Sequence, residues 1–167
     1  MNKPTNTPSD KTKSPSAAAL LLDEQLCFAL YATSLAMTKL YRPLLMALGL
    51  TYPQYLVMLA LWQHGELSVG QLGEQVALDS GTLVPLIRKL GALDLIHRQR
   101  SPKDDRSVLI SLTAKGAALR KQTYTIHEQV LCATQRTDVQ RRALVRDLQT
   151  LRASLLKTVS ATAKASS

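Results

Sequence analysis

The segment from Leu78 to Gly116 constrains the fold of this chain more than any other. It begins with polar residues that suit a helix N-cap and continues with the apolar spacing of an amphipathic helix. Two short β-like runs follow, Ile96–Arg100 and Ser107–Leu112, and the charged turn Ser101–Arg106 joins them. A helix followed by such a hairpin is typical of a winged helix-turn-helix lobe, so we predict a mainly α fold with a small β wing.

Helical patterns precede this segment. A long helix is expected to begin at Asp23, with Ser16 as the competing N-cap, and Thr51 and Ser68 suit the N-caps of two further helices. Two prolines inside the helical patterns, Pro43 and Pro85, are expected to break, bend or delay their helices.

Two long helices are expected downstream, over Thr113–Thr134 and Asp138–Thr158. At 167 residues the chain fits one domain with a full core. The polar, Pro-rich residues 1–19 are expected to be a disordered tail and residues 162–167 a frayed one, which leaves residues 20–161 as the domain.

Charge is distributed unevenly along the chain. The net charge is +9, yet residues 20–86 carry five acids against two bases, whereas residues 88–106 carry six bases against three acids. A positive strip over the predicted helix and hairpin suits a polyanion, most simply DNA. The alternative is an incidental solvated face, because a basic balance alone does not identify a ligand.

The sequence argues against several other classes of protein. No apolar run reaches the ~18 residues of a membrane span, and the N-terminus has no apolar signal core, so we expect a cytoplasmic chain without membrane association. Cys27 and Cys132 lie far apart and are either buried structural thiols or a redox pair. No CxxC, clustered His/Cys set or HExxH motif is present, so neither a metal site nor a cofactor is expected.

The helix predicted from Asp79 to Lys89 is the best candidate for reading DNA. Its exposed first turn is expected to hold three small polar residues, Ser80, Gly81 and Thr82. Small residues at a helix N-terminus allow close approach to phosphates and base edges. Arg88 and Lys89, two turns further on, suit contacts with the DNA backbone. The alternative is an ordinary amphipathic helix of a helical core.

The charged hairpin tip is the second candidate for contact with DNA. Asp104 and Arg106 stand two residues apart in this tip, and Arg98 and Arg100 lie on the run that precedes it. An arginine at such a tip can enter the narrow minor groove, and the nearby carboxylate can hold its guanidinium. The alternative is an ordinary charged turn.

Several of these motifs together resemble one family. Asp104-x-Arg106 followed by Leu112-Thr113-x-x-Gly116 resembles the signature of the MarR family of winged-helix regulators. The runs LDSGTLVPLIRKL and RSVLISLT, with QLCFALY at residues 25–31 and LTYPQYLVMLALW at residues 50–62, resemble its branch of organic-hydroperoxide-sensing repressors. Asp94 stands where the family usually carries glycine, and Asp can adopt a positive φ at some energetic cost.

The resemblance implies that Cys27 is the peroxide-sensing thiol, and it assigns Tyr31, Tyr41 and Tyr52 as hydrogen-bond donors to its thiolate. Helical spacing brings Tyr31 and Tyr41 back near the Cys27 face of a regular helix. Tyrosine hydroxyls that donate to sulfur stabilise thiolate, the form that attacks peroxide to give sulfenic acid. An apolar setting favours organic hydroperoxides. Without the resemblance, Cys27 reads as a small core residue.

The resemblance also implies a role for Cys132. Members with a second cysteine in the corresponding helix form an intersubunit disulfide with the sensing residue, so Cys132 is predicted to resolve oxidised Cys27. The alternative is that Cys132 is a passive helix residue. If the two Cα atoms of the reduced pair lie more than ~7 Å apart, oxidation must move the helices.

The family further implies a homodimer that represses by binding a pseudo-palindromic operator and is not an enzyme. The winged lobe is then expected at about residues 51–112, and the dimerisation helices at about residues 20–49 and 113–161. Two other functions stay open. One is a regulator of the same fold that binds a phenolic or lipophilic ligand near Tyr52 and Trp62, and the other is a thiol peroxidase that uses Cys27.

Overall fold

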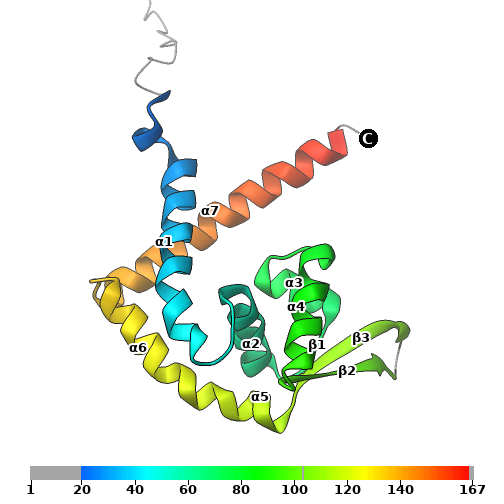
Figure 1. Cartoon of the computed structure of the whole chain (residues 1–167). Coiled ribbons are helices and arrows are strands. Elements are labelled where there is room, and N and C mark those ends of the chain that lie inside the picture. Colours follow the sequence, from blue (N-terminus) through cyan, green and yellow to red (C-terminus); the bar gives the residue numbers. More distant parts are fainter. Residues whose placement is uncertain (1–19, 103, 166–167) are drawn as a thin grey trace, which may run out of the picture.

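The computed structural model describes residues 20–102 and 104–165, with the side chains of residues 104–106 outside the described part. The chain is mainly helical, with one small sheet (Figure 1). In chain order the elements are η2 (Leu22–Glu24), α1 (Leu26–Met46), α2 (Tyr52–His64), β1 (Leu67–Ser68), α3 (Val69–Val76), α4 (Ser80–Ala92), β2 (Ile96–Ser101), β3 (Asp104–Leu112), α5 (Ala114–Leu119), η3 (Arg120–Gln122), α6 (Thr123–Ala133) and α7 (Asp138–Ala165). The predicted tail over residues 1–19 lies outside the described residues.

The predicted winged lobe is confirmed. Its sheet has the strand order β1-β3-β2, with both pairs antiparallel, and Ile96 lies opposite Leu112. Buried side chains of α2, α3, α4 and the sheet form the core, and Leu61, Leu72, Leu83 and Ile110 have no exposed surface. The strands run further into the predicted turn than expected, because Ser101 pairs with Asp104 after an irregularity at Arg100.

Three of the predicted helix starts are confirmed by local hydrogen bonds. The Thr51 N–H and hydroxyl both donate to Gln54 Oε1, at 2.8 and 3.0 Å. The Ser68 N–H donates to Gln71 Oε1 at 2.9 Å, and Asp79 caps α4. The prediction for the first long helix was wrong, because Asp23 lies in η2 and the helix begins at Leu26 after an extended Gln25.

Neither of the two prolines ends its helix. Pro43 lies three residues before the last residue of α1, and Pro85 lies in the second turn of α4, which begins at Ser80 without delay. Each proline lacks the N–H that would donate to the carbonyl four residues earlier, so each helix loses one hydrogen bond and continues past it. The missing donor at Pro85 leaves the Gly81 carbonyl without its usual helical N–H.

The predicted helix over Thr113–Thr134 is divided in two. α5 ends at Leu119, a 3₁₀ turn covers Arg120–Gln122, and α6 begins at Thr123. The Thr123 hydroxyl donates to the Arg120 carbonyl at 2.8 Å and takes an acceptor that a continuous α-helix would use. The last helix is longer than predicted and includes residues 162–165. Residues 166–167 of the predicted frayed tail lie outside the described part.

One glycine determines where α5 crosses the lobe. A Cβ on Gly116 would overlap the Leu95 carbonyl, so only a residue without a side chain allows this approach. The Gly116 N–H donates to Thr113 Oγ1 at 2.9 Å, and the Thr113 hydroxyl donates to the Asp94 carbonyl at 2.8 Å. Asp94 has a φ of 56°, which is the left-handed conformation expected where the family usually has glycine.

α7 leads away from the end of α6 and passes α1 (Figure 1), and its Arg152 and Leu156 line an open pocket with residues of α3 and the start of α4. None of the residues that the structure describes in α7 is buried, and Val139 is 77% exposed. A groove of about 550 Å³ runs between α1 and α7, and Leu26, Leu30, Met37 and Leu144 are among the residues that line it. A single chain therefore leaves the apolar faces of its first and last helices largely uncovered.

We expect Gly116→Ala to lower the free energy of unfolding by about 3 kcal/mol, because the new methyl group must push the α5 backbone off Leu95. Urea unfolding at a fixed protein concentration measures the change. Gly91→Ala is the matched control, since a Cβ there meets no atom within 4 Å, and it should stabilise α4 by about 0.5–1 kcal/mol. Equal stability of Gly116→Ala and the unmodified chain would contradict this account of the crossing.

Candidate DNA-binding surface and redox site

The first turn of α4 presents small polar residues to solvent, as predicted. Ser80, Gly81 and Thr82 are exposed. The Thr82 N–H donates to Asp79 Oδ1 at 2.9 Å and the Thr82 hydroxyl to Oδ2 at 3.0 Å. These two hydrogen bonds hold the pKa of the Asp79 carboxyl below its usual value. The N-cap is therefore ionised near neutral pH and orders the turn that would meet DNA.

The remaining predicted residues of α4 share the face of this turn. Arg88 and Lys89 are exposed, whereas Leu83, Ile87 and Leu90 are buried against the lobe. At ~100° per residue, both cations fall on the side of Gly81 and Thr82, about 9 Å further along the axis from Thr82 to Arg88. A phosphate backbone that follows the exposed face of α4 can thus contact both ends of the helix.

Two of the predicted arginines of the wing lie on one face of β2. Arg98 and Arg100 are exposed and stand two residues apart, opposite Ile110 and Val108 of β3. On the other face, Gln99 Nε2 donates to Glu66 Oε2 at 3.0 Å and ties β2 to the residue before β1. The backbone of Asp104 and Arg106 belongs to β3, but their side chains lie outside the described part of the structure.

Cys27 occupies the first turn of α1, with its side chain exposed. Tyr31 lies one turn further on and is 62% exposed. Tyr41 is on the same side of α1, but α1 is continuous between the two residues, so Tyr41 lies about 21 Å along the axis from Cys27. Within one chain, Tyr41 does not contact Cys27.

Tyr41 instead packs in an aromatic cluster where α1 meets α2. Its ring centroid lies 4.7 Å from that of Tyr52 and 5.5 Å from that of Tyr55. Burial raises the pKa of Tyr41 to about 12, and it raises the pKa of Tyr52 as well. Both hydroxyls therefore keep their protons at neutral pH and can donate hydrogen bonds. Sequence reasoning singled out Tyr41 and Tyr52 but not Tyr55, which completes the cluster.

Cys132 lies in the last turn of α6, also exposed, and both cysteines are free thiols. α1 and α6 pack against each other. Leu26, Ala133 and Thr134 line the groove between α1 and α7, so each cysteine is a direct sequence neighbour of a residue in this groove. Neither cysteine lines the groove itself, but both lie in the part of the chain where α1, the end of α6 and α7 meet around it.

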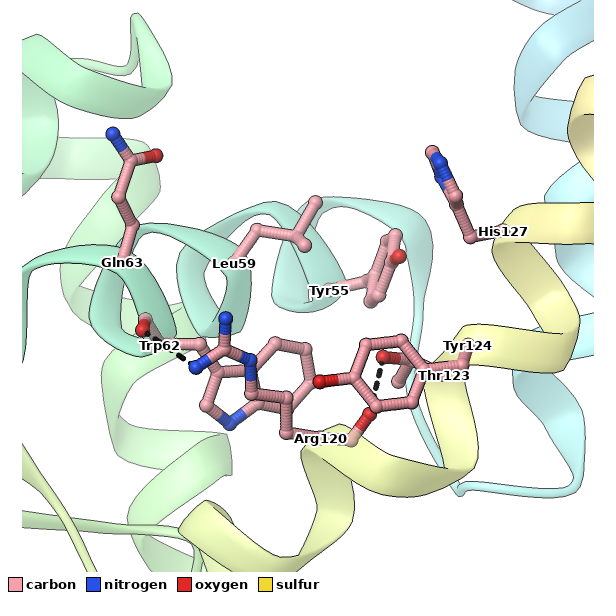
Figure 2. Close-up of a pocket in the computed structure, with 8 residues that line it drawn as sticks. All are labelled: Tyr55, Leu59, Trp62, Gln63, Arg120, Thr123, Tyr124 and His127. Carbon is pink, nitrogen blue, oxygen red and sulfur yellow. Dashed lines mark hydrogen bonds between the residues drawn. The ribbon is translucent and has the colours of Figure 1, made fainter.

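A pocket of about 590 Å³ lies where α2 meets η3 and α6 (Figure 2). Its lining residues are Tyr55, Leu59, Trp62, Gln63, Arg120, Thr123, Tyr124 and His127. Arg120 Nη1 donates to the Trp62 carbonyl at 3.4 Å across one wall. Trp62 belongs to the pocket as predicted, but Tyr52 is absent from the lining set. Sequence reasoning missed Arg120, since nothing near it indicates that Trp62 lies opposite.

Two classes of feature are absent from residues 20–102 and 104–165. No cluster of three or more His, Cys, Asp or Glu side chains could hold a metal ion. Within the same ranges, none of the helices combines the length and the apolar character that crossing a membrane requires.

The chain is similar to known transcriptional regulators in both sequence and structure. Residues 39–123 match the family described as transcriptional regulator SarA/Rot. The organic hydroperoxide resistance transcriptional regulator of Bacillus subtilis is 53% identical over 110 residues, which are 66% of this chain and 75% of that protein.

Two structures of AbfR, a protein of Staphylococcus epidermidis, have a similar fold. Reduced AbfR bound to DNA gives a TM-score of 0.67 at 27% identity and covers 81% of this chain and 95% of its own. Disulfide-formed AbfR gives a TM-score of 0.58 at 29% identity, and the match covers 78% of this chain and 91% of the AbfR chain.

We expect Lys89→Ala to weaken binding to duplex DNA of any sequence and to reduce the slope of log K against log salt by about 1, because one phosphate contact is lost. Fluorescence anisotropy over a range of salt concentrations measures the slope. Lys121→Ala removes the same charge from η3, away from α4, and should leave the slope unchanged. Equal slopes for the two variants would exclude Lys89 from the interface.

Burial of Tyr41 also predicts a dependence of stability on pH. Its pKa is 10.0 in an unfolded chain and about 12 in the folded one, so its contribution is complete below pH 10 and is lost as the pH rises towards 12. The urea midpoint should therefore fall from about pH 10 upward, and less steeply in Tyr41→Phe. Tyr31→Phe, at an exposed position, should follow the unmodified chain, and an identical fall in all three would contradict the prediction.

Proposed function

Because this chain belongs to the SarA/Rot and MarR families of winged-helix transcriptional regulators, we propose that it is a repressor that organic hydroperoxides release from its operator through Cys27. The observation that carries the proposal is the exposed Cys27 thiol in the first turn of α1, beside an uncovered apolar groove. The named function of the Bacillus subtilis relative supports the same signal.

A second copy of the chain supplies the missing cover for α1 and α7. The exposed apolar residues of these helices, among them Leu26 and Leu155, need a partner surface of the same kind. A two-fold axis through this surface pairs two winged lobes, and two α4 helices can then enter successive major grooves of a pseudo-palindromic site about 34 Å apart.

The same pairing explains the distance between Cys27 and the tyrosine cluster. Antiparallel packing of two α1 helices brings the Cys27 end of one copy near the Tyr41 and Tyr52 end of the other. The two phenols are protonated at neutral pH and can donate hydrogen bonds to a thiolate. The predicted roles of Tyr41 and Tyr52 therefore belong to the dimer, whereas Tyr31 lies one turn from Cys27 in the same chain.

The proposed chemistry begins at the Cys27 thiolate. It attacks the O–O bond of the hydroperoxide, so an S–O bond forms as the O–O bond breaks, and the displaced alkoxide takes a proton from solvent and leaves as an alcohol. The Cys132 thiolate of the second copy then attacks the sulfenic sulfur. A disulfide forms, and the sulfenic oxygen leaves as water with one proton from solvent and the one it carries.

Release of DNA follows from the geometry of two linked sites. A disulfide requires Cα atoms within ~7 Å, so α1 of one copy and α6 of the other approach each other on oxidation if the reduced dimer holds the two cysteines farther apart. These helices carry the lobes, and a shift of one lobe prevents simultaneous engagement of both half-sites. Disulfide-formed AbfR is a similar protein with such a bond, which supports this second step.

A gel shift with the operator, before and after cumene hydroperoxide, tests the proposal in the unmodified chain, Cys27→Ser and Cys132→Ser. The reduced unmodified chain should bind and its oxidised form should release. Cys27→Ser should bind and ignore the peroxide, and Cys132→Ser should form a sulfenic acid without a covalent dimer. Release of Cys27→Ser by peroxide, or equal oxidation rates with cumene hydroperoxide and hydrogen peroxide, would overturn the proposal.

A ligand-responsive regulator is the second candidate function, and the pocket at Trp62 favours it. An aromatic wall and the Arg120 guanidinium suit a phenolic or anionic aromatic compound. Release of DNA by such a compound in Cys27→Ser would support this function. A thiol peroxidase would instead consume peroxide continuously with a thiol reductant, whereas the relatives of this chain are transcriptional regulators.

A further inference from the structure

We propose that Trp62 is a positioning residue that couples the tyrosine cluster on α1 and α2 to the C-terminal end of the DNA-reading helix α4. The coupling acts through the hydrogen bond between the Trp62 indole and the Gly116 carbonyl. This inference rests on the proposed function, because it assigns the route by which a change at the thiol site reaches the DNA-binding lobe.

The input side of this route is a continuous series of aromatic contacts. The Tyr41 ring packs on Tyr52 and Tyr55, and the Tyr55 ring meets Trp62 edge to face with centroids 6.2 Å apart. Tyr55 and Trp62 are both buried on α2. Closely packed rings transmit a displacement because a core has little free volume to absorb it.

Two hydrogen bonds connect Trp62, which is buried, to the segment that contains Gly116 and Arg120. Trp62 Nε1 donates to the Gly116 carbonyl at 2.8 Å, and Trp62 is only 8% exposed. Arg120, one turn after Gly116, donates back to the Trp62 carbonyl, as Figure 2 shows. The indole side chain and the backbone of Trp62 are thus both bound to the segment that begins α5 and ends in η3.

The output side leads from Gly116 to the end of α4. Gly116 lies directly against Leu95 and has no room to move towards it. The Thr113 hydroxyl donates to the Asp94 carbonyl, and the Thr113 N–H donates to the Leu95 carbonyl with 3.1 Å between nitrogen and oxygen. Lys115 Nζ donates to the Leu93 carbonyl at 2.7 Å. Leu93, Asp94 and Leu95 directly follow α4. A displacement of α5 therefore moves the C-terminal end of α4 with it.

Trp62→Phe tests the coupling, because phenylalanine keeps an aromatic ring in the core while the indole donor and part of the ring volume are lost. The reduced variant should bind the operator as the unmodified chain does, and Cys27 should oxidise at the same rate. Oxidation should then weaken operator binding by about tenfold less than in the unmodified chain. Full oxidative release by a folded Trp62→Phe protein would overturn the inference.

Arg120→Gln provides a second variant at an exposed position, which keeps the test valid if Trp62→Phe does not fold. It loosens the Trp62 carbonyl from η3 and should also reduce oxidative release. Lys121→Gln changes the same charge at the next residue and should release normally. Equal release of DNA by the two variants would contradict the proposed role of the hydrogen bonds between Trp62 and the segment Gly116–Arg120.

Tryptophan fluorescence reports on Trp62 alone, because Trp62 is the sole tryptophan of the chain. This measurement needs no peroxide. Coupling is reciprocal, so operator binding at α4 should change this emission in reduced Cys27→Ser. An unchanged emission on saturation with operator would overturn the inference. If peroxide fails to release the unmodified chain while the operator still shifts the emission, the proposed function fails and the coupling stands.

Discussion

The structure depends on the close approach of the Gly116 backbone to Leu95. A missing side chain makes this contact possible, and Thr113 secures it by binding both the Gly116 N–H and the Asp94 carbonyl. The crossing joins three parts of the molecule at one point, namely the end of α4, the start of the wing and the start of α5. The Leu-Thr-x-x-Gly pattern is therefore a packing motif, and its value for DNA binding is that it holds α4 and the wing in one orientation.

The proposed redox residues and the proposed DNA-binding residues lie in different parts of the molecule. Cys27 and Cys132 lie on α1 and α6, close to the groove between α1 and α7, whereas the exposed residues of α4 and β2 lie on the winged lobe. The tyrosine cluster lies between them and cannot reach Cys27 of its own chain. One copy thus contains every proposed residue without bringing Cys27 and the tyrosines together, and the apolar surface of α1 and α7 is where the second copy is proposed to pack.

Local hydrogen bonds account for the parts of the fold that were predicted well. The N-caps at Thr51, Ser68 and Asp79 each involve partners only three residues away, so a short stretch of sequence contains the whole interaction. The division between α5 and α6 was missed, although the Thr123 hydroxyl that marks it is also local, because a threonine inside a helical pattern more often stays helical. Pro43 and Pro85 do not end their helices, although each removes one helical N–H donor, because the packing of α1 and α4 outweighs the loss.

The sequence by itself determined three N-capped helix starts, the hairpin, the left-handed residue at Asp94 and the exposed residues on α4. Periodicity and capping depend on neighbours along the chain, so a short stretch of sequence is enough to find them. Only the tertiary structure decided the distance between Cys27 and Tyr41, since periodicity gives the face of a helix but not whether two residues on it meet. It also decided the bond from Trp62 to Gly116, which spans 54 residues and exists only after the lobe has packed. The segment from Leu78 to Gly116 is still the proposed DNA-binding part, and its last residue is held by a tryptophan that lies outside it.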